Sequence, residues 1–424
     1  MQHFSAGQKP KLSRKFLLSA LLCFALQNPL WAAGEHAAEA LHLNAGLTLS
    51  SLLDITIERH PRAGVLAARS ATVAAETRYA NRWLPESTAL NAFHLSDNAL
   101  DDIGVYENEV ALSFPLWLPG EKKAQSRLSE VLAVAQSSDE AALRWRVSGE
   151  LRRQLWQLKL AERHWQLAKE QEQRLSEVLA QVTLFAEAGE LSRADQLATM
   201  EELAVWKGET MLLEAEFMDA LRLYRSFTGL ETIPADTEEP LSERQEISDE
   251  HPALRQALDH LAESSAATEL VRESSNSRPS VDVFWRGFRG DSTSPDVDAL
   301  GIGFAMPLGK SPRREPRVAK AFEAYALAEA ELLETRRLLQ LQLHEAEHVL
   351  HTTRARLENS EMMFEAASER FGLDKMAFEL GEFSTREWLR RLSRFKTIER
   401  SNELLLIEQG AAVAAYNQAV GESL

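Results

Sequence analysis

The sequence predicts a mainly α-helical protein with a membrane β-barrel portion, built from tandem-duplicated long helical hairpins and four β-strands per chain. Three observations lead to this fold class. An unbroken helical run lies between Pro115 and Gly189, it is echoed between Pro307 and Gly381, and the hydrophobic period changes from about 3.6 to about 2 just before each run. A compact enzyme core does not need helices of this length.

The first long helix is predicted over about residues 121–187. This stretch contains no Pro and a single Gly, Gly149, and its apolar residues recur at three- and four-residue steps, as in Leu151, Leu155 and Leu158. That spacing places the apolar side chains on one face of a helix. At about 1.5 Å per residue, the helix would be on the order of 100 Å long.

The second half of the chain repeats the first at a constant step of 192 residues. The matching pairs are Pro115 and Pro307, Gly189 and Gly381, Ser192 and Ser384, Leu197 and Leu389, Tyr224 and Tyr416, and Gly229 and Gly421. The His-Pro pairs that open each half, at His60 and His251, are 191 residues apart. A fixed step over this many landmarks indicates a tandem duplication.

Four segments before the long helices show the period of a β-strand. The even positions from Tyr106 to Leu116 are mostly apolar, and Leu300, Ile302 and Phe304 alternate with small residues. Strands of this kind suit an outer-membrane barrel or a soluble hairpin equally well. Because four strands cannot close a barrel and open sheet edges are not tolerated in lipid, a membrane role would require several chains to share one barrel.

The N-terminus has the features of a cleaved secretory signal peptide. Basic residues precede an apolar run over residues 16–26, and small residues follow at Ala32, Ala33 and Gly34. The only cysteine, Cys23, lies in this run, so the mature chain is expected to lack disulfides and thiolate metal sites. The formal net charge of −17 argues against nucleic-acid binding.

Each half is predicted to contain a helix, a strand hairpin, a long helix, a turn and a shorter helix. A segment with two prolines and many acidic residues separates the halves and suggests an exposed connector. The expected organisation is a signal peptide at 1–33, a first repeat at 34–230, a linker at 231–249 and a second repeat at 250–424. The first repeat would have strands at about 86–97 and 105–117. The second repeat would have strands at about 279–290 and 297–308 and a long helix at about 315–380.

With this order of elements, the chain resembles the outer-membrane efflux protein family, the TolC-like channels of tripartite pumps. The likeness rests on the signal peptide, the His-Pro openings, the strand ends Phe114-Pro115-Leu116 and Met306-Pro307-Leu308, and the turns Gly189 to Ser192 and Gly381 to Ser384. It implies a homotrimer in which each chain gives four strands to a twelve-stranded barrel in the outer membrane. The helices would form a periplasmic tunnel. Partners would be outer-membrane lipid, a periplasmic adaptor and an inner-membrane pump.

The resemblance also implies functional residues. The turns Gly189, Glu190, Leu191, Ser192 and Gly381, Glu382, Phe383, Ser384 would contact the adaptor at the periplasmic tip. Asp195 and Glu387, each six residues past a tip glycine, would form the periplasmic gate. Arg390 stands where relatives often have an acidic residue, which would allow Glu387 to pair with Arg between neighbouring chains. Glu107, Glu109 and Asp282 would face the barrel lumen. A solvated helix face is the alternative for the three gate residues.

The sequence therefore favours a passive exit duct for efflux or secretion, with no enzyme activity and no cofactor. Heavy-metal, drug and protein ducts share this outline, and the acidic charge only slightly favours cations. One alternative is a periplasmic coiled-coil structural or adaptor protein. The other is a zinc metalloprotease using His344-Glu345-Ala346-Glu347-His348, which matches H-E-x-x-H on a helix but lacks an evident third ligand and cleft.

Overall fold

The computed structural model describes residues 42–309, 311–380, 382 and 384–424. The predicted signal peptide, with Cys23, lies outside the described residues. The helices are α1 (Leu49–Arg59), α2 (Pro61–Ala80), α3 (Glu121–Glu187), α4 (Arg193–Thr228), α5 (Pro252–Ser274), α6 (Arg314–Glu379) and α7 (Thr385–Ala419). None of the described helices combines the length and the hydropathy needed to cross a membrane.

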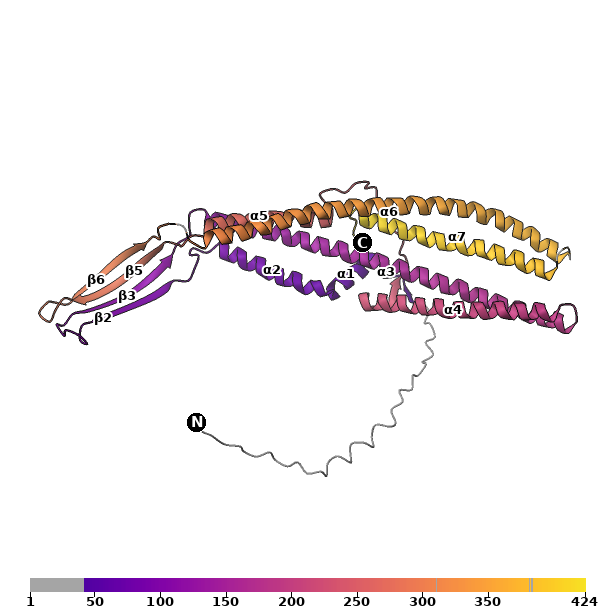
Figure 1. The fold of residues 1–424 in the computed structure, drawn as a ribbon, viewed down its shortest axis with the longest axis horizontal. Helices are drawn as coiled ribbons and strands as arrows, with labels where there is room; N and C mark the ends of the chain where they lie inside the picture. Colours follow the sequence, from indigo (N-terminus) through magenta and orange to yellow (C-terminus); the bar gives the residue numbers. More distant parts are fainter. Residues whose placement is uncertain (1–41, 310, 381, 383) are drawn as a thin grey trace, which may run out of the picture. The chain divides into compact units, whose positions relative to one another are not determined.

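Two long helical hairpins dominate the helical part of the described chain, with α1, α2 and α5 packed along them (Figure 1). Helix α3 packs on α4 and α6 packs on α7, and α3 also contacts α7 and α5. The apolar stripe of α3 is buried at Leu151, Leu155 and Leu158. In the contact between α3 and α7, Gly410 leaves room for the ring of Trp156, because a Cβ at Gly410 would collide with that ring. The predicted long helices are thus confirmed within one residue at each end.

The predicted hairpins pair with each other in one four-stranded antiparallel sheet. Its order is β2-β3-β5-β6, with β2 at Ala89–Ser96, β3 at Tyr106–Pro115, β5 at Ser280–Arg289 and β6 at Val297–Ala305. The central pair joins the two repeats, with Glu109 opposite Arg286 and Ser113 opposite Asp282. The strands are shorter than the predicted segments by a few residues at most ends. Strands β2 and β6 form the edges of this sheet.

The two faces of the sheet differ in polarity, because side chains alternate along each strand. One face carries the charged residues Glu107, Glu109, Asp282 and Arg286, and also Phe93, Leu95, Phe284 and Phe288. The other face is apolar and exposed, with Leu300 at 85% and Ile302 at 80% of their accessible area. Its remaining large members are Leu90, Val110, Leu112, Val283, Trp285 and Phe304.

Histidine and proline start one helix in each repeat. His60 caps α2 and His251 caps α5, and each ring nitrogen Nδ1 accepts a hydrogen bond from the backbone N–H two residues later, at 3.2 Å. The proline that follows suits the first helical position, because its missing N–H is not needed there. His251 is fully buried, and Trp145 of α3 packs edge-on against its ring at 4.9 Å between centroids.

The segment between the repeats is anchored and not simply exposed, in contrast to the predicted connector. A short parallel sheet pairs β1 (His42–Asn44) with β4 (Thr232–Pro234), and Ile233 is buried. Further along, Glu239 lies at 2.6 Å from Arg152 of α3. These contacts could not be predicted from the sequence of the segment. An acidic residue has the same local pattern whether it is exposed or paired with a buried partner far away in sequence.

Candidate functional site

The first hairpin turn, between α3 and α4, is held by its own backbone and by a capping serine. Gly189 has a φ of +79°, a left-handed conformation that favours glycine. The N–H of Glu190 donates to the carbonyl of Phe185 at 2.9 Å, which closes the end of α3. Glu190 and Ser192 are exposed and Leu191 is partly exposed, so the predicted contact residues of this turn are accessible to a partner.

The second hairpin turn repeats this design where the structure describes it. The N–H of Glu382 donates to the carbonyl of Ala377 at 3.0 Å, and the hydroxyl of Ser384 accepts from the N–H of Glu387 at 3.3 Å. Glu382 and Ser384 are exposed. The other two predicted residues of this turn, Gly381 and Phe383, lie outside the described residues.

Asp195, the first predicted gate residue, forms a capping box with Ser192. Its carboxylate accepts from the Ser192 hydroxyl at 2.7 Å and from the Ser192 N–H at 3.3 Å. The Asp195 N–H in turn donates to that hydroxyl at 3.2 Å. A carboxylate in the first turn also interacts favourably with the helix dipole. Asp195 therefore fixes the start of α4 in addition to any role at a gate.

Glu387, the second predicted gate residue, pairs with arginines of its own helix. Its carboxylate lies 3.0 Å from the Arg391 guanidinium and 3.3 Å from that of Arg390. Arg391 also pairs with Asp374 of α6, and these hydrogen bonds, chiefly the one to Asp374, raise the pKa of Arg391. The Glu387–Arg390 pair forms within one chain because the two residues are three apart on one helix face.

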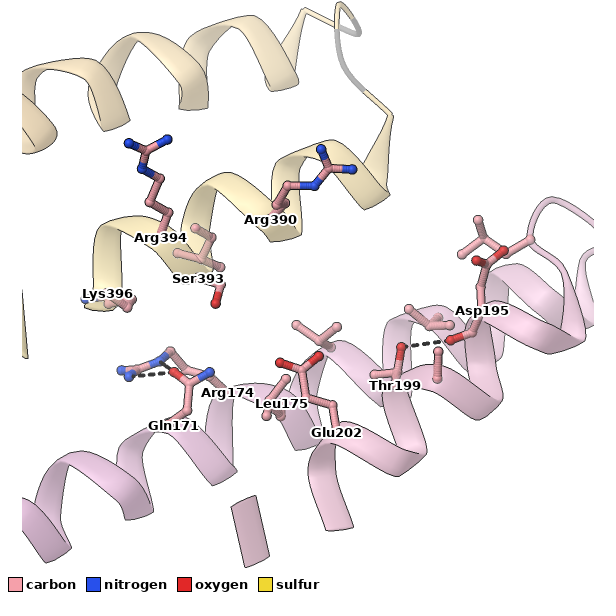
Figure 2. A pocket seen from close by; sticks show the side chains of 15 residues that line it. Gln171, Arg174, Leu175, Asp195, Thr199, Glu202, Arg390, Ser393, Arg394 and Lys396 are labelled. Atoms are coloured by element: carbon pink, nitrogen blue, oxygen red, sulfur yellow. Dashed lines mark hydrogen bonds between the residues drawn. The ribbon is translucent and has the colours of Figure 1, made fainter. Parts of the chain in front are cut away.

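A cavity of about 600 Å³ lies beside these turns, between the two hairpins (Figure 2). Asp195 from the first repeat and Arg390 from the second both line it, whereas Glu387 is not among its lining residues. Its other charged residues, which the sequence did not single out, are Arg174 of α3, Glu202 of α4, and Arg394 and Lys396 of α7. In the sequence, each of these charged residues has the pattern of a solvated helix face. Only the packing of the two hairpins shows that they form a cluster.

Stacked aromatic rings join α6 and α7 next to the second turn. Phe371 stacks on Phe395 at 4.4 Å and on Trp388 at 5.4 Å, and Trp388 stacks on Phe378 at 5.0 Å between centroids. Phe364 continues the series at 6.1 Å from Phe395. The seven-residue spacing of Phe364, Phe371 and Phe378 in α6 is a signal in the sequence that these three rings share one face. The rings therefore connect α6 and α7 near the second turn.

The three carboxylates predicted for a barrel lumen lie on one face of the sheet. Arg286 of β5 lies between two of them, at 2.6 Å from Glu109 and 3.1 Å from Glu107. The sequence did not assign a role to Arg286, although its position, opposite Glu109 across β3 and β5, follows from the register. This face is therefore of mixed charge.

The H-E-x-x-H stretch lies on α6, where His344, Glu345 and His348 are exposed. Among the described residues, no group of three His, Cys, Asp or Glu side chains is placed to hold a metal ion. Glu345 lines a second cavity, of about 900 Å³, between α3, α6 and α7, but neither histidine does. The arrangement that a zinc protease needs is not present in the described part of the chain.

Two helical hairpins joined to a four-stranded sheet, with this order of elements, form the fold of outer-membrane channel proteins. Among solved structures, the chain is similar to VceC, an outer membrane protein of Vibrio cholerae, with a TM-score of 0.69, 13% identity and coverage of 88% of this chain and 96% of that one. It is also similar to the CmeC outer membrane channel of Campylobacter jejuni, with a TM-score of 0.65, 14% identity and coverage of 88% and 85%.

A third structure of this fold is the open state of the MtrE outer membrane channel of Neisseria gonorrhoeae. Its TM-score is 0.61, its identity is 13%, and 88% of each chain is covered. No protein-family model matches the sequence, and no curated protein is similar to it at a significant level. The resemblance inferred from the sequence is thus confirmed at the level of the fold.

Proposed function

We propose that this protein is an outer-membrane exit duct of a tripartite efflux or secretion system, with a periplasmic extension. The observation that carries the proposal is a sheet with one exposed, mainly apolar face and one face that holds the charged side chains of its two central strands, joined directly to paired helical hairpins. A soluble sheet buries its apolar face, whereas a membrane sheet turns it toward lipid. Exposure of Leu300 and Ile302 on strand β6 fits lipid contact.

The duct would be a homotrimer with a twelve-stranded barrel. Strands β2 and β6 are edges of the described sheet. An unpaired edge exposes backbone N–H and C=O groups, and each such group is costly in lipid. Pairing β2 of one chain with β6 of the next removes both edges, and three copies of four strands supply the twelve. The face with Glu107, Glu109 and Asp282 would then line the lumen, and the apolar face would contact outer-membrane lipid.

The helical end would carry the gate and the partner contacts. Asp195, Glu387 and Arg390 lie next to the two hairpin turns, and Asp195 and Arg390 line one cavity between the repeats. The exposed residues of these turns would meet a periplasmic adaptor, which would link the duct to an inner-membrane pump. The duct itself would be passive, without enzyme activity, since the pump would supply the energy.

Single-channel conductance of the purified full chain in planar lipid bilayers tests this function. We expect trimers in the outer-membrane fraction and discrete conductance steps. Glu109→Lys should lower the cation preference of the current, because each of the three chains would replace a negative charge in the shared lumen with a positive one. A periplasmic coiled-coil protein would give neither outer-membrane trimers nor conductance steps, and that result would reject the duct.

A further inference from the structure

Several chain segments meet where the sheet ends and the helices begin. The N–H of Leu116 donates to the carbonyl of Pro279 at 2.9 Å, and the indole N–H of Trp117 donates to the carbonyl of Arg82 at 3.3 Å. The ring of Trp117 also lies 5.4 Å from that of Tyr79. These contacts gather the end of α2, the start of α3 and the approach to β5 into one junction, beside which α6 also begins (Figure 1).

The junction exposes two large apolar side chains. Trp83 and Leu308 each keep 92% of their accessible area. Burial of such side chains away from water is favourable, so their exposure indicates a surface that something else covers. Tryptophan in particular concentrates at membrane–water interfaces, where its ring is amphipathic.

The same junction carries exposed cations without a partner in the described chain. Arg82, Lys122, Lys123 and Arg313 are exposed, and no described carboxylate forms an ion pair with any of them. Lys122 and Lys123 lie in the first turn of α3, where a positive charge opposes the helix dipole. These charges therefore do not serve the stability of the helix that carries them. We call Arg82, Trp83, Lys122, Lys123, Leu308 and Arg313 the junction collar.

Carboxylates at the junction offset the charge of the collar only in part. The exposed Glu273 lies beside the start of α3, where a Cβ at Gly120 would be 2.7 Å from its carboxylate. Glu86 and Glu121 are both paired with Arg278. Glu315 is exposed in the first turn of α6 and is the remaining acidic residue beside Arg313 and Arg314 in sequence. In a chain of formal net charge −17, a surface with an excess of cations is a departure from the average composition.

The opposite end of the sheet is acidic. Its two loops contain Asp97, Asp101, Asp102, Asp291 and Asp296. Strands of 8 to 10 residues separate the loops from the collar. At about 3.3 Å per residue this separation is about 26–33 Å along the strands, and the 35–45° tilt of barrel strands reduces it to roughly 18–27 Å across the membrane, close to the height of the apolar band of a membrane barrel. The sheet thus has a basic rim toward the helices and an acidic rim away from them.

We propose that the junction collar binds anionic phospholipid headgroups in the membrane leaflet that faces the helices. The cations would contact the phosphates, while Trp83 and Leu308 would lie at the boundary between headgroups and acyl chains. This proposal rests on the proposed outer-membrane location. It adds to that function a lipid class, the residues that recognise it, and the depth at which the sheet sits.

Lipid binding to the detergent-purified full chain tests the collar. Energy transfer from the protein's tryptophans to pyrene-labelled phosphatidylglycerol, or to phosphatidylcholine with the same label, gives the two affinities. We expect phosphatidylglycerol to bind at least about tenfold more tightly than phosphatidylcholine, with a ratio that falls as salt rises. The variant Lys122→Gln/Lys123→Gln/Arg313→Gln should bring this ratio close to one.

A matched variant removes the same charge from elsewhere. Lys207, Arg354 and Lys375 are exposed on α4 and α6, and Lys207→Gln/Arg354→Gln/Lys375→Gln should keep the wild-type ratio. An affinity ratio of one for the wild-type protein, or an equal loss of lipid preference in both variants, would overturn the proposal that the junction collar binds anionic lipid. Conductance separates this outcome from failure of the duct: channels without lipid preference reject only the collar, whereas lipid preference without channels rejects only the duct.

Discussion

At the scale of single residues, His251 joins two parts of the second repeat. It caps α5 through Nδ1, and its ring is so close to the chain end that a Cβ at Gly421 would lie 2.7 Å from the ring carbon Cδ2. Burial is the main cause that lowers the pKa of His251 to about 4, and the charge of the nearby Arg244 contributes to this shift. The folded protein therefore holds this histidine neutral over the whole neutral pH range.

This pKa predicts how stability depends on pH. The folded value of about 4 lies below the ordinary 6.5, so between these limits the unfolded chain takes up a proton that the folded chain does not. The contribution of His251 to stability is thus complete above pH 6.5 and declines as pH falls toward 4. His251→Asn keeps an acceptor for the helix cap but does not titrate. We expect a smaller loss of thermal midpoint on acidification in this variant, measured by circular dichroism.

The repeat provides the comparison for this prediction. His60 caps α2 with the same geometry but is only partly buried. Burial also lowers the pKa of His60, followed by the charges of Arg62 and Arg146. His60→Asn should therefore change the pH dependence less than His251→Asn. Identical pH profiles for wild type and His251→Asn would show that the buried ring does not control acid stability.

At the scale of elements, the two hairpins differ in how their turns are supported. The second hairpin has stacked rings between α6 and α7, and a charge cluster in which Asp374 of α6 forms an ion pair with Arg391 of α7. At the positions in the first repeat that match Phe371 and Trp388, the chain has Leu179 and Gln196. The duplication has preserved the turns but not the side chains that hold the helices together.

Removal of the Asp374 charge should loosen the second hairpin near the proposed gate. Asp374 is buried, so Asp374→Asn leaves Arg391 with a weaker acceptor, at a cost of about 1–3 kcal/mol. We expect a higher open probability in planar bilayers, because α6 and α7 are then less tightly joined beside the turn. Glu379→Gln, an exposed change on the same helix, is the control. An equal open probability in the wild type and both variants would show that this cluster does not control the gate.

At the scale of the whole described chain, one buried ion pair connects distant segments. Arg152 of α3 pairs with Glu239 of the linker at 2.6 Å, and their side chains are 5% and 11% exposed. The same guanidinium donates to the Gln418 side chain at 2.6 Å and to the carbonyl of Glu422 at 2.8 Å. The long helix, the linker and the C-terminal segment are therefore fixed to one another at Arg152.

Arg152→Met should destabilise the protein by about 3–5 kcal/mol, because it leaves the Glu239 carboxylate buried without its partner. The double variant Arg152→Met/Glu239→Leu should recover part of this loss, since no buried charge then remains. Urea unfolding of the wild type, both single variants and the double variant measures the coupling. Strictly additive losses would mean that the pair does not act as a unit.

The fold was largely predictable, whereas the site was predictable only in part. The long helices, the strand pairs and the turns at Gly189 and Ser192 follow from local period and turn chemistry. Asp195 and Arg390 were predicted as gate residues, and the structure brings both to one cavity. Arg174, Arg394 and Lys396 in that cavity were not predicted, because a charged residue on a helix has the same local pattern whether it faces solvent or a second hairpin.

The sequence by itself determined the kinds of elements, their order and their duplication, because period, proline and glycine act over a few residues along the chain. Only the tertiary structure decided which side chains meet. It paired Arg391 of α7 with Asp374 of α6, anchored the linker through Arg152, and separated a basic from an acidic rim on the sheet. These contacts depend on the register between packed elements. That register is determined jointly by residues that are far apart in the sequence.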